Sequence, residues 1–450
     1  MPVRTAAAPA AAVLLSAGVL LGRAATSGLD LLQLAREEET SGMLFARVLK
    51  KTVRIGRLTV IDGYGRTHSF QGELPGPSCT LRIHDRALHW RLLANPKLAV
   101  GEAFMDGTLT CEDCGLYEAL DLLAQNLAYL ESHPSQAWRG RLSRIARMVH
   151  THNPIGRAQR NAAHHYDLSG TLYDLFLDKD RQYSCAYFTS DNDNLETAQA
   201  NKKLHLAAKL LLRPGQKVLD IGSGWGGLAL YLARLAGVDV TGVTLSTEQH
   251  KVSQERAAAA GLADRVRFHL RDYRQQPGSF DRIVSVGMFE HVGVGHYREF
   301  FRKAKELLAE DGVMLLHAIG RMEPPGGTNP WLRKYIFPGG YTPALSEVLS
   351  AVEDVGLWVT DIEILRLHYA STLREWRRRF QENRARIEAL YDARFGRMWE
   401  FYLAGCEVAF RYMGQMVFQM QIARRQDAVP LTRDYITDFE RANAGRVLPA

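Results

Sequence analysis

The sequence predicts an α/β protein whose main domain is a doubly wound, mostly parallel sheet, preceded by a smaller α+β unit. The chain has 450 residues, which exceeds one ordinary domain and predicts two domains with a large core. From about residue 200 onward, apolar strand-like runs alternate with helix-like segments, as in a parallel sheet covered by helices. Before residue 135, short strand-like runs come first and helices follow.

The composition is that of a globular protein, with 46% hydrophobic and 23% charged residues. A formal net charge of +7 suits an anionic surface such as phospholipid or nucleic acid, although many soluble proteins carry as much by chance. Five cysteines make no even disulfide framework. Cys111-x-x-Cys114 has no second pair or histidine nearby that would complete a zinc site. The cysteines therefore favour a reducing cytoplasm and no metal.

Residues 1–42 are predicted to be a disordered extension. Arg4 and the Ala- and Leu-rich run 6–21 resemble a secretory signal, but the apolar part is short for a bilayer span. Met43-Leu44-Phe45 reads like a natural start, so residues 1–42 are open to interpretation as an upstream extension. We expect this segment to pack against nothing.

Residues 43–135 form the smaller unit, with strands separated by glycine, proline and aspartate turns. Its predicted strands are 53–61, 67–70, 80–83 and 87–90, and its predicted helices are 98–105 and 116–130.

A basic linker, residues 136–161, follows this unit and is dense in arginine. Leu142, Ile145 and Met148 alternate with the arginines and give the segment an amphipathic character. One interpretation is an interfacial helix that meets anionic lipid head groups. The other is a solvated linker helix packed on its neighbour, and the sequence leaves both open. The arginines are Arg139, Arg141, Arg144, Arg147, Arg157 and Arg160.

Residues 162–425 form the main domain, and residues 426–450 a C-terminal tail. The predicted strands begin at 218 and continue with 238–243, 266–270, 280–285 and 313–317. The predicted helices are 203–212, 228–233, 247–260 and 297–308. Ligands of such sheets bind at the carboxyl ends of the strands. The candidate residues at those ends are the Gly222 loop, Thr244-Leu245, Asp272-Tyr273, Phe289-Glu290-His291 and His317-Ala318-Ile319.

The run from Val218 to Gly227 is the most informative stretch, because an apolar strand ends at Asp220 and enters a glycine-dense turn. Glycine lets a ligand approach main-chain N–H groups that a side chain would shield. The spacing also satisfies the dinucleotide pattern, which expects a carboxylate about 20 residues on, at the end of the next strand. That strand ends in Thr244-Leu245-Ser246, without an acid. The loop therefore favours S-adenosylmethionine over a nicotinamide cofactor.

Several motifs together resemble the cyclopropane-fatty-acyl-phospholipid synthase family. They are Tyr183 to Phe188 (YSCAYF), Gly242 to Ser246 (GVTLS), Met288 to Gly293 (MFEHVG) and Phe337 to Gly340 (FPGG). The resemblance extends from about residue 45 to 425 and implies a class I methyltransferase domain. The amino-terminal unit, above all Pro96 to Gly107, resembles the accessory lipid or dimer domain of the phospholipid-acting members.

The resemblance implies a role for each matching residue. S-adenosylmethionine would be bound by Tyr183, Ser184, Gly222, Gly224, Thr244, Leu245 and Gln249, to which the strand-end positions add Asp220, Asp272 and Tyr273. In relatives a bicarbonate ion lies beside the transferred methyl. Here it would be held by Cys185, Glu290, His317, Tyr369 and the backbone of Ile319, and the first four side chains would be catalytic.

The chemistry of methylene transfer to a double bond explains why such residues are needed. A cis double bond is a weak nucleophile, so it must be desolvated and aligned with the sulfonium methyl, and the carbocation that forms must be tolerated. A base must then take a proton from the added methyl so that the ring closes. Each residue also has a structural interpretation. Cys185 and Tyr369 are open to interpretation as core residues, Glu290 as a cap and His317 as a satisfied core histidine.

The carboxyl-terminal part suits a lipid substrate without establishing one. Residues 331–338 join aromatic side chains to cations, and 373–397 are crowded with arginine, as at a membrane interface. The alternative is ordinary helix faces whose arginines pair with Glu375, Glu382 and Glu388. The methionine-rich stretch 412–420 fits either a wall for an acyl chain or core packing.

The sequence therefore predicts an enzyme that adds a methylene group from S-adenosylmethionine to cis-unsaturated acyl chains of membrane phospholipids. Alternatives are a methyl-branched or methylene product, a small-molecule N-methyltransferase, and a non-catalytic lipid-surface protein. The expected partner is unsaturated phospholipid at the inner membrane surface, with the enzyme cytoplasmic and peripheral. We expect no nucleic-acid partner, and the resemblance suggests a homodimer.

Overall fold

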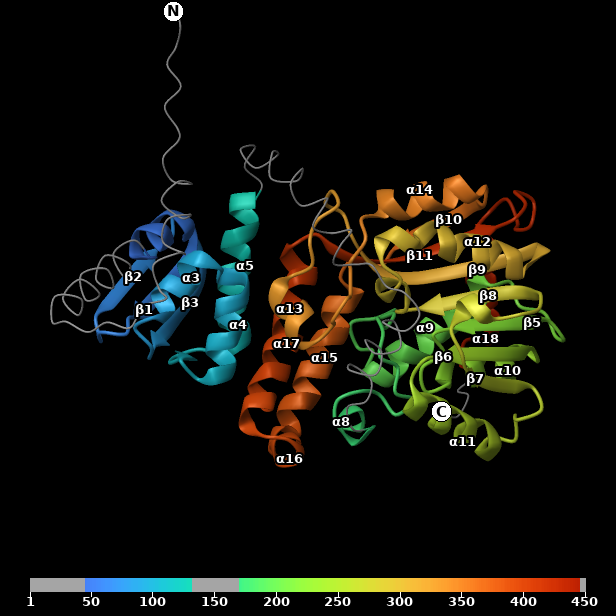
Figure 1. Cartoon of the computed structure of the whole chain (residues 1–450), viewed down its shortest axis with the longest axis horizontal. Helices are drawn as coiled ribbons and strands as arrows, with labels where there is room; N and C mark the ends of the chain where they lie inside the picture. Colours follow the sequence, from blue (N-terminus) through green and yellow to red (C-terminus); the bar gives the residue numbers. More distant parts are fainter. Residues whose placement is uncertain (1–44, 132–169, 446–450) are drawn as a thin grey trace, which may run out of the picture.

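The computed structural model describes residues 45–131 and 170–445. Figure 1 shows three parts in a row: a small unit in blue, a layer of helices near the centre, and a large sheet with its own helices. The predicted extension 1–42 and the basic linker 136–161 lie outside the described residues. Within the two described ranges, no helix is both long and apolar enough to cross a bilayer.

The small unit is a four-stranded sheet covered by helices. The strand order is β2-β1-β3-β4, in which β1 is antiparallel to β2 and parallel to β3. Alternate residues of β1, such as Leu58 and Val60, enter a core that also holds Ala103 and Leu122 from the helices. The elements are β1 (Ile55–Ile61), β2 (Thr67–Gln71), β3 (Leu74–Ile83), β4 (Leu109–Cys111), α3 (Leu88–Ala94), α4 (Pro96–Asp106) and α5 (Leu116–Glu131).

The predicted strand 87–90 is wrong, because these residues begin helix α3. The Asp85 carboxylate accepts a hydrogen bond from the backbone N–H of Ala87 at 2.9 Å and so turns the chain into the helix. Leu88 and Leu92, four residues apart, then both face the core. A four-residue apolar run fits a strand and a buried helix equally well, so its pattern did not distinguish them.

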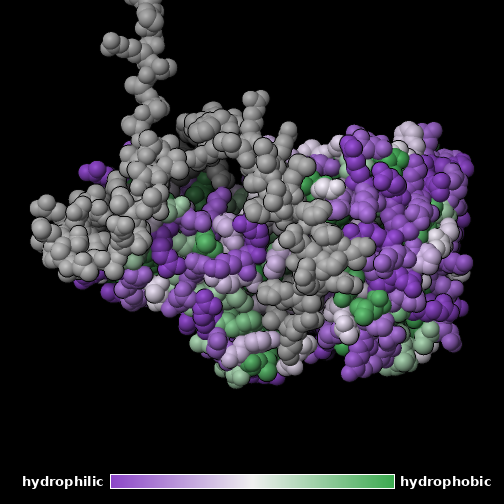
Figure 2. Space-filling model, in the orientation of Figure 1, coloured by the Kyte–Doolittle hydropathy of each residue, from purple (hydrophilic) through white to green (hydrophobic). Residues whose placement is uncertain are grey.

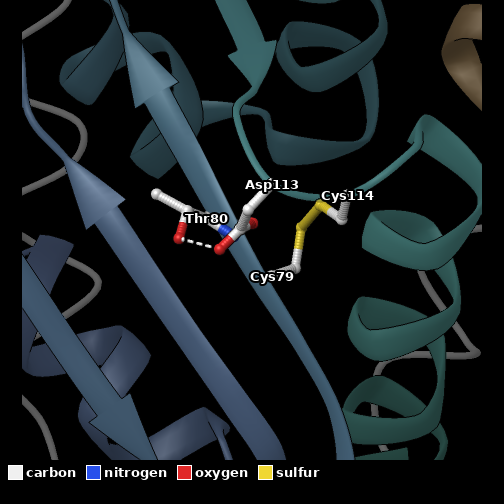
Figure 3. The surroundings of a disulfide bond; sticks show 4 residues. All are labelled: Cys79, Thr80, Asp113 and Cys114. Atoms are coloured by element: carbon white, nitrogen blue, oxygen red, sulfur yellow. Dashed lines mark hydrogen bonds between the residues drawn. A yellow bond between two sulfur atoms is a disulfide. The ribbon is translucent and has the colours of Figure 1, made fainter.

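Figure 3 shows a disulfide between Cys79 and Cys114, which ties β3 to the segment just before α5. Beside it, the Asp113 carboxylate accepts hydrogen bonds from the backbone N–H and the hydroxyl of Thr80, at 2.6 and 2.7 Å. This pairing corrects the expectation that the cysteines form no disulfide framework. The partners are 35 residues apart, and only the packing of α5 on the sheet brings them together.

The large sheet has seven strands in the order β10-β11-β9-β8-β5-β6-β7. The five strands from β9 to β7 in this order are parallel, and β11 alone runs antiparallel to its neighbours β9 and β10. The doubly wound fold is therefore confirmed. Its strands are β5 (Lys217–Ile221), β6 (Asp239–Thr244), β7 (Val266–Leu270), β8 (Phe280–Val286), β9 (Leu308–Arg321), β10 (Trp358–Ile364) and β11 (Gln415–Ala423).

Strand β11 contains most of the methionine-rich stretch. Met416 and Met420 are buried in the core against β9 and β8, so the structure favours core packing for these two residues. Neither β10 nor β11 was predicted from the sequence.

Helices cover both faces of the sheet. On one face, Phe300 of α12 and Val348 of α14 pack over the strands. On the other face, Leu206 of α9, Leu232 of α10 and Ala257 of α11 form a second core. Helix α18, within the predicted tail, packs on α9 through Phe439. The bounds are α9 (Leu195–Lys209), α10 (Gly227–Ala236), α11 (Thr247–Ala259), α12 (Tyr297–Leu307), α14 (Leu345–Val355) and α18 (Asp434–Asn443).

A central layer of helices joins the two units (Figure 1). The indole N–H of Trp331 in α13 donates to the Met105 sulfur of α4, at 3.2 Å. Arg397 of α17 donates to the Met105 carbonyl at 2.7 Å. Trp331 is buried in this joint, so it packs between the units rather than presenting an exposed aromatic anchor. The layer comprises α8 (Gly170–Asp174), α13 (Pro330–Tyr335), α15 (His368–Glu382), α16 (Arg384–Leu390) and α17 (Ala393–Tyr412).

Many arginines of this layer are paired with carboxylates. Arg378 contacts Glu375 at 3.1 Å and Glu382 at 2.5 Å, and Arg384 contacts Glu388 at 2.8 Å. These are the pairs that the ion-pair interpretation named. Figure 2 shows a mainly hydrophilic surface over the large sheet domain on the face in view, with hydrophobic residues in small separate patches.

Candidate active site

A cavity lies at the carboxyl ends of β5, β6 and β8, where the order of the strands reverses. This is where ligands bind in doubly wound sheets. All ten residues that were predicted to bind the cofactor line the cavity. They are Tyr183, Ser184, Asp220, Gly222, Gly224, Thr244, Leu245, Gln249, Asp272 and Tyr273.

The glycine loop between β5 and α10 forms the floor of the cavity. Gly222 has φ +84° and Gly224 has φ +54°, values that side-chain-bearing residues rarely adopt. A Cβ on Gly222 would lie 2.7 Å from the Cβ of Met288, whereas at Gly224 nothing lies within 4 Å. Gly222 is therefore needed for close packing, and Gly224 leaves open space for a ligand against the main chain.

Two buried polar atoms beside the loop have no hydrogen-bond partner among the described residues: Asp220 Oδ2 and Ser223 Oγ. Burial also raises the pKa of the Asp220 carboxyl to about 7. Leaving such groups unpaired is costly, so they fit a polar ligand that would complete their hydrogen bonds. The amino-acid part of S-adenosylmethionine, with its ammonium group, offers the donors that Asp220 lacks.

At the end of β6 the cavity offers amide and hydroxyl groups. The Thr244 hydroxyl donates to Gln249 Oε1 at 2.9 Å, and Ser246 caps helix α11 by accepting from the Gln249 N–H at 3.2 Å. At the end of β7, Asp272 is held by Arg274, whose Nε and Nη2 lie 2.9 and 2.7 Å from its two oxygens. Asp272 therefore reaches the cavity as part of an ion pair.

A segment from outside the sheet, residues 181–184, closes one side of the cavity. The fully buried Lys202 of α9 donates to Gln182 Oε1 at 2.6 Å and to the Ser184 hydroxyl at 2.9 Å. Burial lowers the pKa of Lys202 to about 8. The lysine thus fixes Gln182 and Ser184, two of the polar side chains that this segment presents to the cavity.

Two of the proposed catalytic residues are next to cavity-lining residues in the sequence. Cys185 follows the cavity residue Ser184, and Glu290 lies between the cavity residues Met288 and His291. Glu290 Oε1 accepts from the backbone N–H of Ile319 at 2.6 Å, so these two predicted residues are in contact. Glu290 Oε2 is buried and has no partner among the described residues. Burial raises the pKa of Glu290 to about 7.

His317 lies on β9, two residues before Ile319, and is buried. Its Nδ1 is 3.2 Å from Nε2 of Gln419 on the neighbouring strand β11. Burial lowers the pKa of His317 well below its ordinary value, and the nearby cations Lys202 and Lys209 lower it further. The ring is therefore neutral at physiological pH.

Cys185 and Tyr369 belong to one hydrophobic cluster, against which the partly buried Ile319 packs. The Cys185 thiol donates to the Ala186 carbonyl at 3.3 Å, and burial raises its pKa, so it is a neutral thiol. The Tyr369 ring packs against Trp376 and Phe410, with centroids 5.8 and 4.7 Å away. The structure therefore joins Glu290 to Ile319 by a hydrogen bond and Cys185 to Tyr369 through a common apolar core.

Several residues at the site were missed by the sequence analysis. Gln182 and Trp225 line the cavity, and Lys202 and Gln419 hold residues that were predicted from the sequence. His291, which was among the strand-end candidates, also lines the cavity. Gln182 lies directly before the motif that begins at Tyr183, and Trp225 lies within the glycine loop, so position alone was a signal. Lys202 and Gln419 had none, because their roles depend on burial and on pairing between distant segments.

The fold and the cavity together define a Rossmann-like, class I S-adenosylmethionine-dependent methyltransferase domain. The crystal structure of the mycolic acid cyclopropane synthase CmaA1 complexed with SAH and CTAB is similar, with a TM-score of 0.56 and 36% identity. It aligns with 60% of this chain and 99% of that chain.

Residues 155–420 match the model of the family described as mycolic acid cyclopropane synthetase. The chain belongs to this family. The cyclopropane-fatty-acyl-phospholipid synthase of Escherichia coli (strain K12) is 37% identical over 76% of this chain and 87% of its own length. The tuberculostearic acid methyltransferase UfaA1 of Mycobacterium tuberculosis is 34% identical over 85% of this chain and 92% of its own length. The protein is therefore an S-adenosylmethionine-dependent methyltransferase of a lipid-modifying family.

Proposed function

We propose that the enzyme adds a methylene group from S-adenosylmethionine to cis double bonds in the acyl chains of membrane phospholipids, forming cyclopropane rings. The observation that carries this proposal is the buried Glu290 carboxyl, which lies next to the cofactor cavity with one oxygen unpartnered among the described residues. A small-molecule methyl acceptor such as an amine, which attacks with its own lone pair, needs no such buried acidic group. Family membership and the similarity to the Escherichia coli synthase support the same substrate class.

The reaction needs a methyl donor, an aligned olefin and a base. S-adenosylmethionine supplies an electrophilic methyl on a sulfonium. The π electrons of the olefin form a bond to that methyl carbon, the C–S bond electrons stay on sulfur, and S-adenosylhomocysteine leaves. A base then removes a proton from the added methyl, and the C–H electrons close the ring. Excluding water is essential, because water would trap the carbocation.

The residues of the chain suit this sequence of steps. His317 and the Cys185 thiol are neutral, and the Glu290 carboxyl can be neutral near pH 7 because of its raised pKa. These three groups therefore add little charge of their own that would attract water. The aromatic rings of Tyr369 and its neighbour Trp376 lie in the same buried cluster. Aromatic faces stabilise a cation by roughly 0.5–2 kcal/mol each.

We also propose that bicarbonate is held at this site. The unpartnered Glu290 Oε2 is a buried polar atom that such a ligand would satisfy. Glu290, His317, Tyr369, Cys185 and the backbone of Ile319 would hold the ion, which would supply a weakly nucleophilic base. The Ile319 N–H already donates to Glu290 Oε1, so it would have to be shared with the ion or released to it.

A methyl-branched or methylene product is the second candidate, and it shares the first bond-forming step. The observation that favours it is the 34% identity to the tuberculostearic acid methyltransferase over 92% of that relative's length. The routes diverge after methyl transfer: direct loss of a methyl proton closes the ring, a hydride shift to the cationic carbon followed by loss of a methyl proton leaves a methylene group, and loss of a proton from the chain leaves a methyl-branched olefin.

Incubation of the purified protein with labelled S-adenosylmethionine and vesicles of mono-unsaturated phospholipid tests the proposal. We expect label in the lipid, a gain of one CH2 and loss of the olefin. Label with the olefin retained would support the methylene route. If no lipid is labelled but a small amine is, the protein is an N-methyltransferase and the proposal fails.

We further propose that the enzyme acts as a cytoplasmic protein at the inner membrane surface, as a homodimer. Its basic net charge of +7 supports attraction to anionic lipid. Co-flotation with anionic vesicles at low salt, and its loss at high salt, would support surface binding. Sedimentation of the purified protein as a monomer would contradict the dimer.

A further inference from the structure

A chain of buried hydrogen bonds reaches from the surface of α18 to the ring of His317. Its members lie on α9, β10, β11 and α18, which are distant in sequence. Within the described residues, Gln419 is the one hydrogen-bond partner of the His317 ring. The protein therefore controls this ring through a single amide.

We propose that Lys209 and Gln419 are positioning residues that fix His317 in one tautomer, with the proton on Nε2, so that the ring is a hydrogen-bond donor. The placement of His317 at the reaction centre rests on the function proposed above, whereas the tautomer of its ring does not. Neither residue is assigned a role by the motifs of the sequence.

The first step of the argument is the lysine. The Lys209 side chain is fully buried, and its Nζ donates to Gln419 Oε1 at 2.8 Å. An ammonium group has only donors, so the atom facing it must be the amide oxygen. The orientation of the Gln419 amide, which is ambiguous in many proteins, is therefore fixed chemically.

The second step follows from that orientation. With its oxygen on Lys209, the Gln419 side chain turns its NH2 group toward His317 Nδ1, at 3.2 Å. Gln419 and His317 are directly paired across β11 and β9, so this approach is built into the sheet register. An amide nitrogen only donates, so Nδ1 must accept with its lone pair. A neutral imidazole then carries its proton on Nε2.

The charge state of the ring supports a single proton. Burial lowers the pKa of His317, and the groups that face it electrostatically are all cationic: Lys202, Lys209 and His205. A second proton on the ring would therefore be strongly disfavoured at neutral pH.

The lysine is itself held in place from outside. Glu363 of β10 accepts from Lys209 Nζ and from His205 Nε2, the latter at 2.7 Å. His205 Nδ1 in turn contacts Glu440 of α18 at 2.6 Å. These contacts raise the pKa of His205 and lower that of Glu363, so both are charged. Burial lowers the pKa of Lys209, and the Glu363 carboxylate opposes this effect and stabilises the buried ammonium that orients the amide.

The consequence is a defined role for His317. A ring with its proton on Nε2 and its Nδ1 occupied donates one hydrogen bond and has no free lone pair with which to accept a proton. His317 therefore orients an acceptor, such as an oxyanion, and is not the base that closes the ring.

Nitrogen-15 NMR of the full-length protein with labelled histidine tests this tautomer directly. His317→Gln identifies the His317 signals among the 15 histidines. We expect a protonated Nε2 and an unprotonated Nδ1 in the wild type. A protonated Nδ1, or an imidazolium, would overturn the proposal. This readout needs no lipid turnover, so it stands apart from the failure or success of the proposed function.

Gln419→Glu is the matched perturbation. Its carboxylate accepts from Lys209 and from a protonated Nδ1, so we expect the ring to lose its Nε2–H tautomer. The kcat for lipid should fall at least about tenfold, which is about 1.4 kcal/mol in the barrier, with the affinity for S-adenosylhomocysteine unchanged. Gln421→Glu is the control, since Gln421 is equally buried on β11 but bonds the Lys209 carbonyl. An unchanged tautomer in Gln419→Glu, or an equal change in Gln421→Glu, contradicts the positioning role.

Discussion

At the scale of single residues, burial decides the chemistry of this site. Glu290 and Asp220 both have pKa values raised to about 7 because burial disfavours the ionised carboxyl. His317 and Cys185 are kept neutral by the same cause. The two carboxyl groups therefore have protonation states near pH 7 that differ from those of exposed carboxyls, which the sequence alone does not specify.

The raised pKa of Glu290 predicts a pH-dependent stability. The folded protein holds this proton up to about pH 7, and the unfolded chain releases it near the ordinary value of 4.5. The stabilisation that this bound proton gives the folded protein is fully present below the unfolded pKa of 4.5. It is lost as the pH rises through the folded pKa of about 7. As the pH rises from about 5 to about 8, the free energy of unfolding of Glu290→Gln should fall by about 3 kcal/mol less than that of the wild type.

Urea unfolding at several pH values measures this difference. Glu306→Gln is the control, because Glu306 is an exposed residue that pairs with Lys303 on the surface. Identical pH profiles for Glu290→Gln and the wild type would show that the carboxyl is not buried as described.

The glycine loop gives a second residue-scale prediction. Gly222→Ala would place a Cβ 2.7 Å from Met288 at φ +84°. Gly215→Ala has the same backbone strain, with φ +81°, but nothing within 4 Å of the added Cβ. We expect Gly222→Ala to weaken S-adenosylhomocysteine binding at least about tenfold, or about 1.4 kcal/mol. Gly215→Ala should leave the affinity unchanged. If calorimetry gives Gly222→Ala and Gly215→Ala equal affinities for S-adenosylhomocysteine, the loop is not part of the binding site.

At the scale of elements, the joint between α4 and α13 connects the accessory unit to the methyltransferase domain. A Cβ on Gly101 would lie 2.5 Å from the Trp331 indole, so only glycine allows this close approach. Lys334 and Tyr335 of α13 both donate to Glu102 beside it, at 2.7 and 2.9 Å. Gly101 and Glu102 of the motif region Pro96 to Gly107 thus pack against the catalytic domain, whereas Ala99 and Ala103 face the core of the small unit.

A pair of glycine substitutions tests this joint. Gly101→Ala should lower stability by about 1–3 kcal/mol through overpacking, despite the better helix propensity of alanine. Gly405→Ala, in α17 with nothing within 4 Å, should instead raise stability by about 0.5–1 kcal/mol. Both are measured by thermal unfolding. A stabilised Gly101→Ala would mean that the two units are not packed as described.

At the scale of the whole molecule, the parallel strands β5, β8 and β9 could be predicted from the sequence because long stretches of them are buried on both faces and are rich in apolar residues. The cofactor residues followed, since the carboxyl ends of those strands share one edge. The antiparallel strand β11 was not predictable, because its polar residues Gln419 and Gln421 are buried with partners on α9 and on other segments distant in sequence. Lys209 and Gln419 are 210 residues apart, and no local pattern links them. The Cys79–Cys114 pair escaped prediction for the same reason.

The central claim is that this enzyme closes a ring on a phospholipid olefin. The most direct measurement is the mass spectrum of vesicle phospholipid after turnover with a cofactor that carries three deuterium atoms on its methyl group. Ring closure removes one deuteron from that methyl. We predict a lipid that retains two deuterium atoms and has lost its olefin, as shown by resistance to ozonolysis. Deuterated lipid that is still cleaved by ozone, or no deuterium in lipid, would contradict the claim.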